Sequence, residues 1–353
     1  MTPPDPIHIG SHLVGPGHAT YLVAELSANH NGELGRAVET IHAAAEAGAD
    51  AVKFQTYTAD TITIRSNRPE FIVGGTGPWA GRTLYDLYHE AHTPWDWHPK
   101  LFEEARARGI DAFSTPFDPT AVALLQRLGA PAFKVASFEL VDDGLLQAVA
   151  ATGKAVVLST GMATAEEILH AVGVLRAAGC RELLLLRCTS SYPAPDDAMQ
   201  LSTIPRLQTL AGCPVGLSDH SLGTTAPVVA VTLGASLIEK HFTLSRKGGG
   251  VDSHFSLEPA EFRSLVMEVR RAEAMVGHPA FGPGVTEEGN VVFRRSLYVV
   301  ADIPPGGEFS SRNVRSIRPG FGLSPRYLEL VLGRRTSRAI ARGTPLSWDL
   351  VFP

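Results

Sequence analysis

Short apolar runs alternate with longer amphipathic stretches from Tyr21 to about Met275. The runs have the length of strands, and some, such as Leu183 to Leu186, are apolar without alternation, as expected for strands that are covered on both faces. Between them lie stretches with helical periodicity, for example residues 34–47, 164–178 and 258–276, each followed by a glycine suited to end a helix. This pattern predicts repeated βα units and a parallel sheet.

The number of units suggests how the sheet closes. The strand-like runs begin at Tyr21, Ala51, Asp111, Pro131, Ala155, Glu182, Cys213 and Leu237. Eight βα units predict a closed (β/α)8 barrel, the TIM-barrel architecture. We therefore predict a barrel domain over residues 1–280, of which residues 1–18 form an N-terminal extension.

The second connection, residues 58–98, is too long for an ordinary loop between a strand and a helix. It is rich in glycine and carries the aromatic residues Trp79, Tyr85, Tyr88, Trp95 and Trp97. Long loops in compact domains are often lids or binding loops. A packed surface excursion without any substrate contact explains the same composition, so both interpretations stay open.

A Gly/Pro-rich stretch that starts at Gly277 ends the βα pattern. Residues 281–353 have the character of short strands and turns with many glycines and prolines, and they are too few for a large independent core. We predict a linker and a small appended domain that docks on another surface.

Charge and composition exclude several classes of partner. The chain has 31 Lys and Arg against 36 Asp and Glu, a formal net charge of −5, and no basic stripe that would neutralise a nucleic-acid backbone. Its start lacks a basic run followed by an apolar segment, and no stretch approaches the roughly 18 apolar residues of a membrane span. We expect a cytoplasmic protein that binds neither nucleic acid nor membrane. Cys180, Cys188 and Cys213 lie on or beside apolar runs and are predicted to be buried and free.

Polar residues gather where the apolar runs end. Because the active site of such a barrel is built at the carboxyl ends of its strands, we expect these side chains to face one site. Each buried polar group needs a partner or a ligand, so polar residues at all eight ends indicate function. In chain order they are Glu25; Lys53 and Gln55; Ser114 and Thr115; Lys134, Ser137 and Glu139; Ser159 and Thr160; Thr189, Ser190 and Tyr192; Ser218, Asp219 and His220; and Glu239, Lys240 and His241.

Two lysines in this set, Lys53 and Lys134, indicate an acidic substrate. Together with hydroxyl groups they would form a site suited to a phosphate plus a carboxylate. The hydroxyl groups are those of Thr115, Ser137, Ser159 and Ser218. An alternative is that each lysine pairs with a carboxylate such as Glu25 or Glu139 and only closes a layer of the barrel.

His220 and His241 end neighbouring strands and are candidates to bind a divalent cation through neutral imidazole nitrogens. A hydrogen-bonded structural role is the alternative for either one. Asp252 and Glu139 are candidates to hold metal-bound water or to transfer protons, and a loop cap or a salt bridge is their alternative.

In combination, the strand-end motifs resemble the sialic acid synthase family over nearly the whole chain. The tail stretch SIRPGFGLSP (316–325) is similar to the antifreeze-like (SAF) domain that follows the barrel in this family. The resemblance implies a TIM barrel followed by a small C-terminal SAF domain, and a homodimer in which the tail of one subunit closes the barrel of the other. The matching stretches are AELSANHNG (24–32), GADAVKFQTYT (48–58), STPFD (114–118), FKVASFE (133–139), STGM (159–162), CTSSYPAP (188–195), GLSDHSLG (216–223) and IEKHFTL (238–244).

The resemblance also implies a reaction, the metal-dependent condensation of phosphoenolpyruvate with an N-acetylated amino sugar. It assigns Mn or Mg to His220 and His241, and an acyl group of the sugar to Arg318 of the partner subunit. C3 of phosphoenolpyruvate attacks the sugar aldehyde, water adds at C2, and phosphate leaves by C–O cleavage. The implied substrate contacts are Lys53, Gln55, Thr115, Lys134, Ser137, Ser159, Ser190 and Ser218, and the implied groups for the sugar and the proton transfers are Glu25, Glu139, Tyr192 and Asp252.

Within the family, stretches such as SANHNG, ASFE and DSHFSLEP are more similar to pseudaminic acid synthases than to N-acetylneuraminate or legionaminic acid synthases. Sialic acid synthases often have Asn at the place of Ser190 and a small residue at that of Phe138. Both differences favour a less hydroxylated, 6-deoxy diacetamido sugar. Val251 and His254 depart from the usual family pattern in the last barrel loop.

Three alternatives remain beside this interpretation. The same condensation on N-acetylmannosamine or on the legionaminic acid precursor would use the same residues. A non-catalytic protein that binds phosphoenolpyruvate or a sugar would need none of the proton-transfer groups. An aldolase that forms a Schiff base on Lys134 or Lys53 would need no metal.

Overall fold

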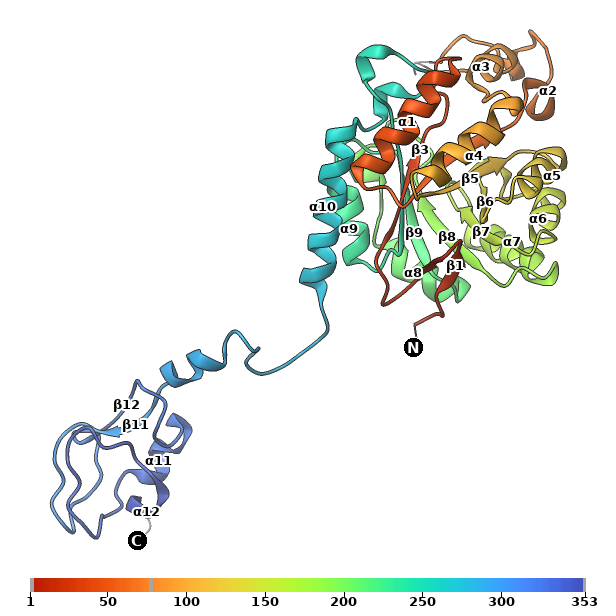
Figure 1. Ribbon diagram of the computed structural model, residues 1–353. Helices are drawn as coiled ribbons and strands as arrows, with labels where there is room; N and C mark the ends of the chain where they lie inside the picture. Colours follow the sequence, from red (N-terminus) through yellow and green to blue (C-terminus); the bar gives the residue numbers. More distant parts are fainter. Residues whose placement is uncertain (1–2, 76–78, 352–353) are drawn as a thin grey trace. The chain divides into compact units, whose positions relative to one another are not determined.

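The computed structural model describes residues 3–75 and 79–351 (Figure 1). Residues 76–78 of the second connection and the two residues at each end lie outside the described residues. The chain divides into two compact units, of which the first ends at Gly277 and the second begins at His278. The sequence-based boundary at residue 280 falls in the exposed stretch 277–290.

The first unit contains a closed barrel of eight parallel strands, and the pairing of the last strand with the first closes it. This confirms the predicted (β/α)8 fold. The strands are β3 (Tyr21–Glu25), β4 (Ala51–Thr56), β5 (Asp111–Pro116), β6 (Ala132–Val135), β7 (Ala155–Ser159), β8 (Leu183–Cys188), β9 (Val215–Asp219) and β10 (Leu237–His241).

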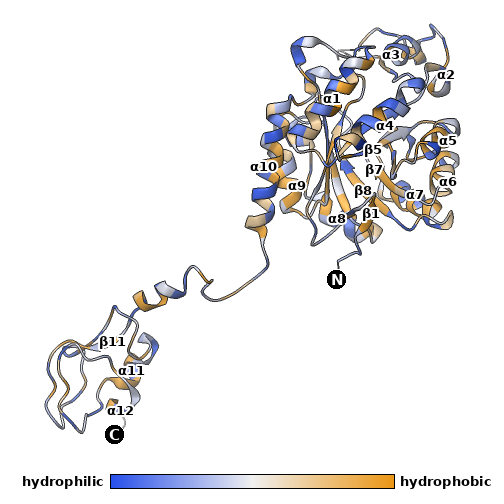
Figure 2. Cartoon of the chain, viewed as in Figure 1, coloured by the Kyte–Doolittle hydropathy of each residue, from blue (hydrophilic) through white to orange (hydrophobic). Residues whose placement is uncertain are grey.

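Helices surround the barrel (Figure 1), and their ends follow local sequence signals. Thr164 and Glu167 form a reciprocal capping box, and Gly48 ends the first helix in the left-handed conformation that glycine adopts without strain. The helices mix hydrophilic and hydrophobic residues (Figure 2), as expected when one face packs on a sheet. They are α1 (Leu34–Ala47), α4 (His98–Ala107), α5 (Pro119–Arg127), α6 (Asp143–Ala150), α7 (Ala165–Ala177), α8 (Thr203–Ala211), α9 (Thr225–Thr232) and α10 (Pro259–Val276).

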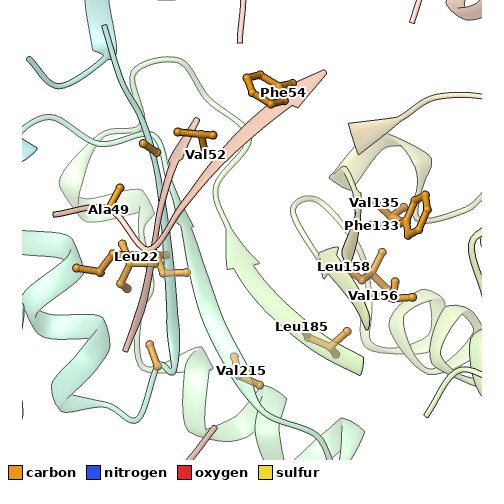
Figure 3. Close-up of a cluster of buried hydrophobic side chains, with 14 of the residues drawn as sticks. Leu22, Ala49, Val52, Phe54, Phe133, Val135, Val156, Leu158, Leu185 and Val215 are labelled. Atoms are coloured by element: carbon orange, nitrogen blue, oxygen red, sulfur yellow. The ribbon is translucent and has the colours of Figure 1, made fainter. Parts of the chain in front are cut away.

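Strand side chains alternate between the inside of the barrel and the helix layer. Tyr21 and Val23 of β3 belong to the inner cluster, whereas Leu22 belongs to the larger cluster between strands and helices. Figure 3 shows other members of that outer cluster, among them Val52 and Val156. The alternation decides which polar residue at a strand end points into the barrel mouth, because that residue must lie an even number of positions from the inner residues of its strand.

The N-terminal extension forms a hairpin of β1 (Ile7–Ile9) and β2 (His12–Val14). Ile7, Ile9 and Val14 join the inner cluster of the barrel, and the carboxylate of Asp111 lies 3.0 Å from His12 Nδ1. The hairpin therefore packs against the residues at which the strands begin. Three-residue strands are too short to show a hydrophobic period, so the sequence did not predict them.

The described parts of the second connection contain short helices and turns. They are α2 (Ala59–Ile62), the 3-10 turn Pro69–Phe71, α3 (Leu84–Ala91) and the 3-10 turn Trp95–Trp97. The Thr83 side chain caps α3 by accepting a hydrogen bond from the backbone N–H of Asp86.

The second unit has a small core of its own. Its antiparallel strands are β11 (Ser296–Val299) and β12 (Val314–Ile317), and its helices are α11 (Leu328–Val331) and α12 (Trp348–Val351). Its buried residues include Leu297, Phe309, Val331, Ile340 and Leu346.

The prediction that all three cysteines are buried and free is confirmed. No helix in the described ranges is long and apolar enough to cross a membrane.

Candidate active site

The carboxyl ends of the strands enclose a small pocket of about 60 Å³, which we name the polar chamber. Every strand of the barrel contributes to it directly or through the residues that follow it, as the alternation requires. Its lining residues include Glu25, Lys53, Gln55, Thr115, Lys134, Ser137, Ser159, Cys188, Tyr192, Ser218, His220, Glu239 and His241.

Two buried lysines and two buried carboxylates form one network at the floor of the chamber. Lys134 Nζ donates to both carboxylate oxygens of Glu239, at 2.8 and 3.0 Å. Lys53 Nζ lies 2.7 Å from Glu25 Oε2 and 3.7 Å from Glu239 Oε1. The lysines therefore do pair with carboxylates, but the partner of Lys134 is Glu239 and not Glu139.

The network sets the charges of its members. Burial would raise the pKa of Glu239, but the ion pairs with Lys134 and Lys53 outweigh it and lower the pKa to about 2. Burial lowers the pKa of Lys134 despite Glu239, whereas for Lys53 the two carboxylates overcome burial and raise the pKa. Burial raises the pKa of Glu25, against the effect of Lys53.

Hydroxyl groups complete the donor set. Lys53 Nζ donates to Thr115 Oγ1 at 3.1 Å, and Ser218 Oγ donates to Glu239 Oε1 at 3.2 Å. Ser159 Oγ is buried and has no hydrogen-bond partner within the described ranges. A buried hydroxyl that lacks a protein partner is suited to a ligand. The floor thus offers cations and hydroxyls to an anion with several oxygens.

His220 and His241 face each other with ring centroids 5.3 Å apart. His220 Nδ1 lies 3.0 Å from the carbonyl of Thr189, which can only accept, so Nδ1 carries the proton and Nε2 keeps the lone pair. His241 Nδ1 is buried and has no partner among the described residues. Burial, with a smaller effect of His220, holds the pKa of His241 well below its usual value, so the ring is neutral.

This donor set fits a divalent cation. His241 supplies a neutral imidazole, whereas burial lowers the pKa of His220 and the hydrogen bond with Cys188 outweighs burial and raises it, so His220 binds a cation once its Nε2 has lost a proton. In residues 3–75 and 79–351, no group of three or more His, Cys, Asp or Glu side chains is arranged to hold a metal. A cation held by these two imidazoles alone would keep positions open for substrate oxygens and water.

A second and larger space, which we name the apolar chamber, adjoins the first and has a volume of about 470 Å³. The two share Gln55, Phe117, Ala136, Phe138, Tyr192 and His241, so they meet along this seam. The remaining residues of the apolar chamber are Ser27, Tyr57, Ile62, Val73, Trp79, Leu84, Leu87, Tyr88, Ala91, Glu139, Val251 and Asp252.

Two of the predicted catalytic carboxylates line the apolar chamber. Burial raises the pKa of Glu139 to about 7, and its Oε2 has no hydrogen-bond partner in the described part of the chain. Burial also raises the pKa of Asp252, against a hydrogen bond that Ser27 Oγ donates to Oδ2. Both carboxyls are thus held closer to the protonated form than a carboxyl in water.

A hydrogen-bonded chain joins the two chambers. Gln55 Nε2 donates to Glu25 Oε1 at 2.9 Å and to Ser27 Oγ at 3.1 Å. Ser27 in turn donates to Asp252. Gln55 and Ser27 therefore link a carboxylate of the polar chamber with one of the apolar chamber.

Ser137 lines the polar chamber, and Ser190 lies close to it beside the same loop. Ser137 Oγ accepts a hydrogen bond from the backbone N–H of Gly161 at 3.0 Å, and Ser190 Oγ lies 3.7 Å from Cys188 Sγ. A side chain at Gly161 would clash with both hydroxyls, so the close approach of this loop requires glycine. Ser190 lines neither chamber.

The prediction that all strand-end polar residues face one site is wrong for Ser114, Thr160, Thr189, Asp219 and Lys240, which line neither chamber. Thr189 Oγ1 donates to the carbonyl of Ala198 at 3.2 Å. Lys240 Nζ lies 2.6 Å from Asp219 Oδ2, and both are buried outside the chambers. Ser114 Oγ shares a hydrogen bond with Thr56 Oγ1 at 2.7 Å, and Thr160 Oγ1 donates to the carbonyl of Leu186. The alternation of strand side chains turns them toward the helix layer.

Arg318 lies in the second unit, where it is exposed. Its contact with the sugar stays a prediction.

Sequence reasoning missed roles for Glu239, Ser27 and Cys188. The inward direction of Glu239 can be predicted, because it lies two positions from both Leu237 and His241 on one strand. The apolar run around Cys188 predicts only a buried thiol, yet Cys188 lines the polar chamber. Burial would raise the pKa of Cys188, but the hydrogen bond to His220 lowers it to about 7.

Comparisons with known proteins agree over most of the chain. Residues 40–280 match the model of the NeuB family, and residues 294–351 match that of the SAF domain. The pseudaminic acid synthase of Campylobacter jejuni is 44% identical over 92% of this chain and 95% of that protein. The pseudaminic acid synthase of Helicobacter pylori is 41% identical over 93% of this chain and 96% of its own length.

A solved structure supports the same relationship. The crystal structure of N-acetylneuraminic acid (sialic acid) synthetase from Leptospira borgpetersenii, in complex with citrate, superposes with a TM-score of 0.73 at 32% identity. It covers 82% of this chain and 96% of that one.

Proposed function

The chain belongs to the NeuB family, and from this premise we propose that it condenses phosphoenolpyruvate with 2,4-diacetamido-2,4,6-trideoxy-L-altrose and water to give pseudaminic acid and phosphate. The observation that carries the proposal is the pairing of a cationic, hydroxyl-rich chamber with a larger apolar one that opens directly from it. The similarity to pseudaminic acid synthases supports this choice of sugar.

Phosphoenolpyruvate occupies the polar chamber in this proposal. Lys53 and Lys134 attract its phosphate and carboxylate, while their carboxylate partners keep the empty site near neutrality. The hydroxyls then replace water around the anionic oxygens. These hydroxyls are those of Thr115, Ser137, Ser159 and Ser218.

The open-chain sugar enters through the apolar chamber, with its aldehyde at the seam near Gln55 and His241. C3 of phosphoenolpyruvate forms a bond with the aldehyde carbon, using the electrons of the C2–C3 double bond. Water adds to the electron-poor C2, and the C2–O bond to phosphate breaks, which leaves a ketone at C2.

His220 and His241 would hold a divalent cation, Mn or Mg. When bound, it supplies a Lewis acid for the aldehyde oxygen.

Protons move through carboxyl groups whose pKa values suit the task. Glu139, with a pKa of about 7, exchanges a proton readily at neutral pH. Asp252 and Glu25, linked through Gln55 and Ser27, orient the sugar and the entering water. Tyr192 packs on His220 with ring centroids 4.4 Å apart and bounds the seam.

Assembly is part of the proposal. The second unit of one chain closes the barrel of a second chain in a domain-swapped homodimer, and Arg318 contacts an acyl group of the sugar there. The enzyme acts in the cytoplasm. Exposed apolar side chains at the barrel mouth support a covering partner, since Phe138 is 59% and Met162 62% exposed.

An oxygen label tests the reaction. Phosphoenolpyruvate carrying ¹⁸O between C2 and phosphorus is incubated with the full chain, Mn and the altrose sugar, and phosphate and sugar are analysed by mass spectrometry. We expect the label in the phosphate, because the C2–O bond breaks. Label retained in the sugar acid would contradict the proposed order of bond changes.

One observation favours a second candidate, an aldolase that forms an imine. Burial lowers the pKa of Lys134, as in lysines that attack carbonyl groups. Its ion pair with Glu239 opposes this role. Borohydride with a 2-keto acid separates the two, since an aldolase would gain the mass of the reduced adduct and a synthase would not.

A further inference from the structure

Much of the lining of the apolar chamber comes from the second connection. This segment contributes aliphatic and aromatic side chains from α2, from α3 and from the stretch between them. They are Ile62, Val73, Trp79, Leu84, Leu87, Tyr88 and Ala91.

The wall is held in place from several sides. Trp79 Nε1 donates to the carbonyl of Val251 in the last barrel loop at 3.1 Å, and Trp95 Nε1 donates to the carbonyl of Tyr57 at 3.1 Å. The Tyr57 ring packs edge-on against Tyr88, with centroids 5.7 Å apart. These contacts join the second connection to the last barrel loop and to the residue that follows β4.

Polar groups are distributed unevenly in this space. The carboxylates of Glu139 and Asp252 stand on the side of the strands and the last barrel loop, whereas Ile62, Leu84 and Leu87 present only carbon. A hydroxyl group against these three would lose its water without gaining a partner, and a methyl group would gain contact.

We propose that Ile62, Leu84 and Leu87 form a specificity wall that receives the methyl end of the acceptor sugar and disfavours sugars with a hydroxymethyl group there. The inference rests on the proposed function and names the side chains that would select its 6-deoxy sugar. The volume of about 470 Å³ is within the range of small-molecule sites.

The strength of this selection is limited by its physical origin. An apolar pocket discriminates against an added hydroxyl by roughly 10- to 200-fold, because it lacks partners but does not exclude the shape. We therefore expect the chain to prefer the 6-deoxy sugar over its 6-hydroxy counterpart by a factor in this range.

The test compares kcat/KM for 2,4-diacetamido-2,4,6-trideoxy-L-altrose and for the same sugar with a C6 hydroxyl, with the full chain, phosphoenolpyruvate and Mn. Leu84→Ser and Ile62→Ser place a hydroxyl in the wall, and both positions are half-buried. Each should lower the 6-deoxy to 6-hydroxy ratio by about fivefold or more, while the KM for phosphoenolpyruvate stays unchanged.

A matched control lies in the same segment. Ile64 is 61% exposed and lines neither chamber, so Ile64→Ser should leave the ratio at the wild-type value. Leu84→Met, which conserves volume and apolarity, should do the same, and thermal melting checks that all variants fold.

If both Leu84→Ser and Ile62→Ser keep the wild-type 6-deoxy to 6-hydroxy ratio and the wild-type melting temperature, the proposed specificity wall is wrong. A wild-type ratio near one leads to the same conclusion. No turnover of either sugar by the wild type would overturn the proposed function itself, and the inference with it.

Discussion

The polar chamber and the apolar chamber adjoin at the same barrel mouth but are built from different parts of the chain. Strand ends form the first, where backbone pairing fixes each position and polar side chains satisfy one another, as Lys134 and Glu239 do. The second is lined largely by residues of α2, of α3 and of the stretch between them in the second connection, where the Tyr57 and Tyr88 rings pack against each other.

Because the two chambers are built differently, we expect substitutions in the first to affect the reaction rate and substitutions in the second to affect the choice of sugar. A network of buried charges tolerates little change, because the loss of one member leaves another without its partner. An apolar wall on a connecting segment changes gradually, since each side chain adds contact area and not a charge. The account therefore expects large effects on turnover from the polar chamber and graded effects on substrate choice from the apolar one.

The largest effect should come from the histidine pair. His220→Ala removes one of the two proposed metal ligands, and we expect turnover to fall about 10³-fold or more, because several kcal/mol of charge stabilisation is lost. Bound Mn, measured by elemental analysis after dialysis, should fall in parallel. An active variant that still responds to a chelator would place the metal elsewhere.

Breaking the ion pair on the chamber floor should rank next. Lys134→Met leaves Glu239 buried with a weaker partner, and we expect a loss of about 3 kcal/mol in the free energy of unfolding and about 10²-fold or more in kcat/KM. Denaturant titration and steady-state kinetics measure the two.

The double variant Lys134→Met/Glu239→Gln is the control. It removes the uncompensated charge, so stability should recover while activity does not. Recovery of activity would show that the pair serves only to close the barrel.

Glu139 is an ionisable group that lines the otherwise mostly apolar chamber, so it links that chamber to the reaction itself. Glu139→Gln should lower kcat by about 10²-fold if the carboxyl moves a proton, with the KM for phosphoenolpyruvate unchanged. If the variant instead binds phosphoenolpyruvate more weakly with an unchanged kcat, Glu139 contributes to phosphoenolpyruvate binding and not to proton transfer.

The same variant has a pH signature in stability. The folded pKa of Glu139, about 7, lies above its ordinary value of 4.5, so the folded state binds more protons between these values. The contribution of the raised pKa to the free energy of unfolding is therefore fully present below pH 4.5 and is lost as the pH rises through 7. Relative to Glu139→Gln, the wild type should lose up to about 3 kcal/mol over this interval, measured by denaturant titration. A flat difference would contradict the raised pKa.

The smallest effect belongs to Arg318. As a proposed contact from the second unit of a partner, it touches the sugar at one point, and Arg318→Ala should raise the sugar KM by about tenfold without changing thermal stability, as expected for one charge-assisted hydrogen bond. Arg315 is also exposed, and Arg315→Ala serves as the matched control. Unchanged kinetics for Arg318→Ala would remove it from the site.

The two chambers also differ in how far the sequence predicts them. The barrel follows from eight repeated apolar runs, and Lys53, Lys134 and His241 were found because they stand where these runs end. Lys240 and Asp219 were misplaced because the alternation within a strand was not applied to its last residues.

The apolar chamber had no such signal. Ile62, Leu84 and Leu87 are ordinary apolar residues in a segment without a long period, and only the fold brings them into one chamber with Glu139 and Asp252. The N-terminal hairpin escaped for a similar reason, because three-residue strands carry no readable alternation.

Phosphate release from phosphoenolpyruvate by the purified protein shows whether the proposed condensation takes place. The assay uses Mn or a chelator, and as acceptors the altrose sugar, its legionaminic acid counterpart and N-acetylmannosamine. We expect metal-dependent release with the altrose sugar and much less with the other two. Faster release with another sugar would contradict the specificity, and no release with any of them would contradict the proposed reaction.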